Sequence, residues 1–109
     1  MDKIKRRQIP IPRKIRVGKK MYSIDVVETM LRNGEMARVY PHEKRMQIAK
    51  RSNISGRKFT EAEMQDSFWH EMVHAILVDM EEFKLNSNEA FVTKFANRLT
   101  KAIRSARFK

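Results

Sequence analysis

Hydrophobic and polar positions follow two different patterns along the chain, and the change comes near residue 60. Before it, short apolar stretches are bounded by Gly, Pro and Asn, which is typical of strands joined by turns. Gly18-Lys19-Lys20 separates two such stretches and predicts a hairpin, and Asn33-Gly34 favours a tight turn. The strands expected from this pattern are Lys14–Val17, Met21–Val27, Glu35–Tyr40 and Arg45–Ala49.

After residue 60 the apolar positions repeat at helical spacing. Thr60 and Glu63 form a capping box, which predicts a helix from there to about Met80. Asn86 and Glu89 form a second such box, which predicts the start of another long helix. We expect the core face of that helix to consist of Phe91, Val92, Phe95, Ala96, Leu99, Ala102 and Ile103. The order of elements predicts an α+β fold, with a small antiparallel sheet followed by two long helices.

The length of 109 residues is that of one domain. We expect residues 14–109 to form this domain and residues 1–13 to form a flexible basic arm, because Pro10 and Pro12 exclude a helix there. The chain has no cysteine, which excludes disulfides, thiolate zinc sites, iron–sulfur clusters and thiol nucleophiles. A bound metal would therefore need His, Asp or Glu as protein ligands.

The charge is strongly positive and concentrated at both ends of the chain. The net charge is +11, with +8 in residues 1–20, −3 in residues 21–93 and +6 in residues 94–109. Basic ends suit contact with nucleic acid, acidic protein or anionic lipid, and a merely solvated basic face is the alternative. No apolar run approaches the roughly 20 residues of a membrane span, and no apolar stretch follows the basic N-terminus as in a secretory signal. We expect a cytoplasmic protein without a membrane partner, with nucleic acid as a candidate partner of the basic ends.

The first predicted helix carries His70-Glu71-Met72-Val73-His74, which is the HExxH pattern. Residues four apart on a helix lie one above the other, with Cβ atoms about 6 Å apart, so both imidazoles can reach one zinc ion. Glu71 lies one step round the helix and can act as general base towards a metal-activated water. The surrounding helix is apolar on almost all sides, and three ionisable residues in its middle would be costly unless they serve a site. The pattern therefore predicts a hydrolytic zinc site.

A catalytic zinc site needs a third protein ligand, and two residues could supply it. Glu89 begins the second long helix and comes near the two histidines if that helix packs back along the first. His42, on a turn between two strands, is the alternative. Spacing favours Glu89 and leaves His42 open. Asp66, four residues before His70, could accept the second ring proton of that histidine.

The motif and the helix after it resemble a known family. Trp69–Leu77, Asn88-Glu89 and Phe95–Leu99 look like the short phage-encoded zincin metallopeptidases, which are similar to the ImmA/IrrE-type metallopeptidases. In the wider group HExxH is followed by Glu-x-x-Ala-Asn-x-Phe-Ala. Here the Glu and the Phe-Ala keep their spacing, while Val92-Thr93 replaces Ala-Asn. The resemblance extends over Thr60–Leu99, and only HExxH within it is a specific motif.

The resemblance implies a minimal zincin-like fold with a gluzincin-like metal site. Its zinc ligands would be His70, His74 and Glu89, with Glu71 as the general base. In zincins an edge strand above the active-site helix pairs with the substrate backbone, which would occur here through strand addition. The candidate strand consists of Arg45, Met46, Gln47, Ile48 and Ala49. For a phage-encoded protein, the expected location is the host cytoplasm.

The function expected from the sequence is that of a zinc-dependent metallopeptidase with a protein or peptide substrate. A nucleic-acid-associated basic protein is one alternative, and it rests on the two charged ends. A metal-stabilised interaction module without turnover is another, because a chain of 109 residues has little room for a substrate-specific cleft. Zinc occurs in the first and third hypotheses, so metal content alone does not separate them.

Overall fold

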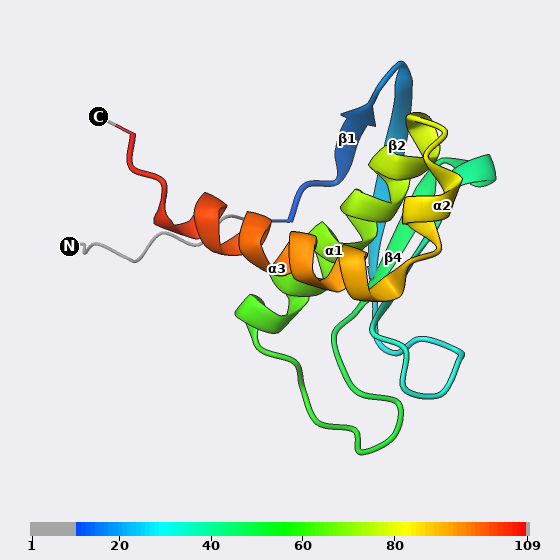
Figure 1. The fold of residues 1–109 in the computed structure, drawn as a ribbon. Helices are drawn as coiled ribbons and strands as arrows, with labels where there is room; N and C mark the ends of the chain where they lie inside the picture. Colours follow the sequence, from blue (N-terminus) through cyan, green and yellow to red (C-terminus); the bar gives the residue numbers. More distant parts are fainter. Residues whose placement is uncertain (1–10, 109) are drawn as a thin grey trace.

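The structure, a computed structural model, describes residues 11–108. The predicted α+β fold, a sheet followed by two long helices, is confirmed (Figure 1). Residues 1–10 of the predicted basic arm lie outside the described residues. The elements in chain order are β1 (Lys14–Val17), β2 (Lys20–Val27), β3 (Ala37–Tyr40), a short 3-10 turn (Pro41–Glu43), β4 (Arg45–Ala49), α1 (Glu61–Asp79), α2 (Phe83–Asn86) and α3 (Glu89–Ser105).

The four strands form one sheet in the order β1-β2-β4-β3. β1 is antiparallel to β2 and β3 is antiparallel to β4, but β2 and β4 are parallel. The prediction of an antiparallel sheet is therefore wrong for the central pair. The chain crosses to the far edge of the sheet after β2, so that β4 returns between β2 and β3. Asn53 holds the crossing loop, because its side chain donates to the carbonyls of Met30 and Arg32 and accepts from the Gly34 N–H.

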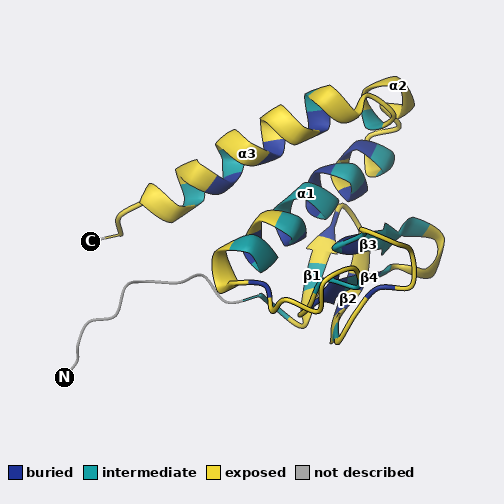
Figure 2. Ribbon diagram, turned by 90° about the horizontal axis from the view of Figure 1, so that it is seen from below, coloured by how far each residue is buried: buried dark blue, intermediate teal, exposed yellow. Residues whose placement is uncertain are grey.

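Helix α1 lies between the sheet and α3 (Figure 2). Towards the sheet its buried residues Phe68, Met72 and Ala75 join a core that includes Met46 and Ile48 of β4. On another side of α1 a second buried cluster joins it to α3 and consists of Val73, Leu77, Val92 and Ala96. Two covered sides explain why α1 is apolar over most of its circumference.

The starts of the two long helices differ in how well the sequence predicts them. The capping box of α1 is present, since Thr60 Oγ1 accepts from the Glu63 N–H and Glu63 Oε1 accepts from the Thr60 N–H at 2.9 Å. The second predicted box is wrong, because the N-cap of α3 is Asn88, whose side chain accepts from the Phe91 N–H at 3.0 Å. Residues after α1 form the short helix α2, and this moves the cap two positions beyond Asn86.

The first described residues already contact the sheet. Ile11 packs against the core cluster of the sheet, and the Arg13 carbonyl accepts from the Ile24 N–H at 2.8 Å. The last three residues of the predicted arm therefore belong to the folded unit. Across residues 11–108, no helix has both the length and the apolar content to cross a membrane.

Candidate metal centre

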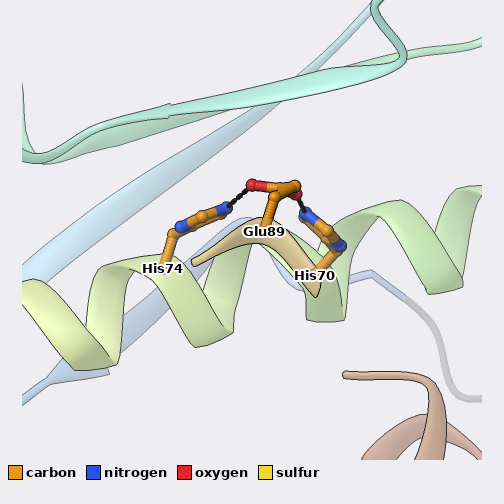
Figure 3. A group of neighbouring side chains, drawn as sticks. All are labelled: His70, His74 and Glu89. Atoms are coloured by element: carbon orange, nitrogen blue, oxygen red, sulfur yellow. Dashed lines mark hydrogen bonds and ion pairs between the residues drawn. The ribbon is translucent and has the colours of Figure 1, made fainter. Parts of the chain in front are cut away.

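The centre of the site is a group of three side chains from α1 and α3. His70 and His74 project from one side of α1, with ring centroids 5.1 Å apart. The carboxylate of Glu89 lies between them (Figure 3). Its Oε2 is 2.6 Å from His70 Nε2, and its Oε1 is 3.3 Å from His74 Nε2. One ligand atom from each residue lies within 4.8 Å of the others, so this group could hold a metal ion.

The path of the chain between α1 and α3 brings Glu89 to the histidines. α1 ends at Asp79, and Glu81 adopts the left-handed conformation with a φ of 61°, which turns the chain back. The short helix α2 follows, and Asn88 then caps the start of α3. Glu89 is the first residue of α3. The packing of Val92 on α1 fixes this end of α3 beside the motif. Glu89 is therefore placed by the packing of two helices.

Asn86 is a residue of the site whose role the sequence did not indicate. Its Oδ1 lies 2.7 Å from His74 Nδ1. Because a side-chain amide oxygen only accepts, this contact requires a proton on His74 Nδ1, and in the neutral form of that tautomer Nε2, which faces Glu89, is the nitrogen that can bind a metal. The sequence indicated this contact only weakly, since Asn86 and Asn88 are both suitable as the N-cap of the next helix.

Glu71 is the half-buried acid of the site and reaches from α1 to the sheet. Its Oε1 accepts a hydrogen bond from the backbone N–H of Val39 in β3 at 3.0 Å. Burial raises the pKa of Glu71 to about 7, and the charges of Glu89 and Glu35 act in the same direction. His74 and the Val39 N–H oppose this rise. A carboxyl group with such a pKa can both accept and release a proton near neutral pH.

A cleft of about 450 Å³ opens beside these residues. His70, Glu71, His74 and Glu89 line one side of it, and β3 lines the other. A second hollow of about 430 Å³ adjoins His70 and Glu71 towards the N-terminal half of α1. The site thus has room for a ligand on both sides of the motif.

The prediction that Arg45–Ala49 is an edge strand is wrong. Arg45–Ala49 is β4, which is paired with β2 on one side and with β3 on the other, so its backbone groups are already used. The edge strand beside the motif is β3, Ala37–Tyr40. Strand prediction found both segments but not their order, because the order depends on how the chain crosses after β2.

Two other candidates lie away from the metal group. His42 is exposed on the 3-10 turn after β3 and does not belong to the group formed by His70, His74 and Glu89. Asp66 pairs with Arg104 of α3 at 3.1 Å, where it ties the two helices together. Among the sequence candidates for ligands, the structure therefore brings together His70, His74 and Glu89.

No model of a known family, curated protein sequence or solved structure matches this chain significantly. The resemblance to the phage zincin metallopeptidases stays a hypothesis that rests on the motif residues. The geometry of the site is independent of that resemblance.

Proposed function

We propose that this protein is a zinc-dependent metallopeptidase, with His70, His74 and Glu89 as zinc ligands and Glu71 as general base. The observation that supports it best is the convergence of these three donors beside the half-buried carboxyl group of Glu71 in an open cleft. Two imidazoles and one carboxylate form a donor set found in catalytic zinc sites, which keep one further position for water. The chain's resemblance to phage-encoded zincins points to the same chemistry.

The donor atoms present fit zinc in their chemistry. The hydrogen bond between Asn86 and His74 places a proton on Nδ1, so that Nε2 is the nitrogen of His74 that would bind a metal. Glu89 would contribute a carboxylate oxygen from a second helix, so the ion would link α1 to α3. When bound, zinc supplies a Lewis acid that polarises a carbonyl group and lowers the pKa of water.

Glu71 would move the proton of the reaction. It accepts a proton from the attacking water while the water oxygen forms a bond to the carbonyl carbon of the peptide. It then delivers this proton to the amide nitrogen as the carbon–nitrogen bond breaks, so that a carboxylic acid and an amine leave. The hydrogen bond from Val39 holds its carboxylate at the wall of the cleft, where it can reach both the attacking water and the leaving nitrogen.

The edge strand β3 favours an extended peptide as substrate. It lines the cleft opposite the motif, and one of its edges carries no strand in the described sheet. An extended chain can add to such an edge through backbone hydrogen bonds, which do not depend on side-chain identity. We infer that β3 takes the role predicted for Arg45–Ala49.

The first experiment measures zinc per chain after dialysis. The samples are the wild type, His70→Ala, Glu89→Ala and Glu71→Gln. We expect one zinc in the wild type and in Glu71→Gln, and loss or strong weakening in the two ligand variants. No zinc in the wild type after reconstitution would overturn the proposal.

The second experiment offers zinc-loaded wild type and Glu71→Gln a proteome-derived peptide mixture and follows new chain ends by mass spectrometry. We expect cleavage by the wild type and none by Glu71→Gln, which keeps the metal but lacks the base. Equal cleavage by both proteins would exclude Glu71 as base. Stoichiometric zinc without cleavage by either protein would favour the metal-stabilised interaction module instead.

A further inference from the structure

The face of α3 that points away from α1 forms a polar and basic surface, which we call the α3 ridge. Figure 2 shows this outward side of α3 as exposed. Its members are all exposed and are Lys94, Asn97, Arg98, Lys101 and Ser105. Helical spacing places its three cations in one row over about 10 Å. The opposite side of α3 is apolar and packs on α1.

The cations of the α3 ridge have no acidic partner among residues 11–108. No ion pair or side-chain hydrogen bond involves Lys94, Arg98 or Lys101 in this part of the chain, and after Glu89 the sequence contains no acid. Many other cations are compensated, since the salt bridges of the described residues join Arg38, Arg45, Lys50, Arg51, Arg57 and Arg104 to carboxylates. The ridge is therefore a row of positive charge left free for an external anion.

We propose that the α3 ridge binds the phosphate backbone of duplex nucleic acid without sequence preference. A convex helix can enter the major groove of a duplex, whose width is about 12 Å. Lys and Arg neutralise phosphates, and Asn and Ser side chains also donate to phosphate oxygens. This composition matches the residues of the ridge.

The chemistry of the ridge favours nucleic acid over the other polyanions. A protein interface has an apolar core, and the middle of the ridge contains only polar and charged side chains. A helix that docks on a lipid surface inserts an apolar face. The buried apolar residues of α3, Val92 and Ala96, pack against α1, while Phe95 is half exposed and is not a member of the ridge, which has no apolar side chain to insert. Interfaces with nucleic acid are polar and positively charged, as the ridge is.

This surface is separate from the metal centre. Glu89 at the start of α3 contacts His70 and His74 of α1, whereas the ridge faces away from α1. Binding to nucleic acid should therefore need neither zinc nor Glu71. Failure of the peptidase proposal would leave this inference intact, and the reverse also holds.

The test is fluorescence anisotropy with two 20-base-pair duplexes of unrelated sequence, in a salt series and in the presence of a chelator. The ridge variant is K94Q/R98Q/K101Q, and the control is R32Q/K44Q/K58Q. Both variants lose two lysines and one arginine, so their net charge is equal, and all six residues are exposed. Far-ultraviolet circular dichroism and a thermal melt verify that each variant is folded, and K94Q/R98Q serves if the triple variant unfolds.

We expect the wild type to bind both duplexes alike and to lose affinity steeply with salt. The ridge variant should bind at least about tenfold more weakly at low salt, with a salt slope smaller by about 2 to 3, because each neutralised phosphate contributes about 0.9. The control should bind within about threefold of the wild type. Equal weakening of both variants, or no binding at low salt, would overturn the proposal. Loss of binding to anionic lipid vesicles by the ridge variant, with duplex binding unchanged, would assign the ridge to a membrane surface instead.

Discussion

At the scale of single residues, Asn86 gives the clearest test of how the proposed metal centre is prepared. Its amide oxygen holds His74 in the tautomer that presents Nε2 to Glu89. Removing such a partner of a metal-binding histidine typically weakens metal affinity by about 10 to 100-fold. We expect this loss in Asn86→Ala, measured as the zinc dissociation constant in competition with a chelating dye. Asn86→Asp keeps an acceptor and should bind zinc much more tightly than Asn86→Ala.

The control for this prediction is Asn97→Ala, since Asn97 is exposed on α3 and is not among the residues that line the cleft. Its zinc affinity should equal that of the wild type. A folded Asn86→Ala protein with wild-type zinc affinity would show that the hydrogen bond does not prepare His74.

At the scale of elements, the turn between β1 and β2 packs against the end of α1 at Gly18. Its φ is 61°, and a Cβ at this position would overlap the carboxylate of Asp79. Gly18→Ala should therefore cost the left-handed penalty of about 1–2 kcal/mol and a steric cost as well. The measurement is the free energy of unfolding in urea.

Gly56→Ala is the matched control for Gly18→Ala. Its φ is 77°, but nothing lies within 4 Å of an added Cβ. It should show the backbone penalty alone, so its loss of stability should be the smaller one. Combining Gly18→Ala with Asp79→Ala should recover part of the difference, and equal losses in Gly18→Ala and Gly56→Ala would contradict the predicted overlap.

The N-terminus of α1 predicts a dependence of stability on pH. Glu63 completes the capping box and pairs with Arg57 at 3.0 Å, and these contacts lower its pKa from 4.5 to about 2. Because the folded state has the lower pKa, the contribution of Glu63 is present above pH 4.5 and is lost as the pH falls towards 2.

Glu63→Gln should therefore flatten the fall in stability across this acid range, as measured by urea unfolding at pH 6 and at pH 3. Gln can keep the reciprocal hydrogen bond of the capping box, so the variant removes chiefly the charge. Glu61→Gln, in the same first turn of α1, should leave the acid dependence close to that of the wild type. If the free energy of unfolding of Glu63→Gln fell with pH as steeply as that of the wild type, Glu63 would not be the source of this acid dependence.

The sequence predicted those features of the elements that depend on local spacing. The capping box of Thr60 and the face shared by His70 and His74 follow from helical geometry within a few residues. The order of β3 and β4 depends on a loop crossing the sheet, and local hydrophobic patterns do not encode it. Asn86 could not be assigned either, because only the packing of α2 decides which asparagine caps α3.

At the scale of the whole molecule, the proposed zinc ion would add a link between two layers that a small apolar cluster and the pair of Asp66 with Arg104 already join. His70 and His74 belong to α1, which is packed on the sheet, and Glu89 belongs to α3. A ligand that binds only the folded state stabilises it by about 2.7 kcal/mol at a concentration of 100 times its dissociation constant. For a domain of this size, that corresponds to an increase in Tm of about 10–20 °C.

We therefore expect a chelator to lower the Tm of zinc-loaded wild type by about this amount, as measured by differential scanning calorimetry. Glu71→Gln should show the same shift, because it keeps all three ligands. Glu89→Ala should melt at nearly the same temperature with and without zinc, since it lacks the ligand from α3. If zinc instead raised the Tm of Glu89→Ala as much as that of the wild type, the ion would be held by α1 alone and would not connect the two layers. Comparing the Tm shifts of the three proteins distinguishes the stability that zinc adds by linking α1 and α3 from the role of Glu71 as general base.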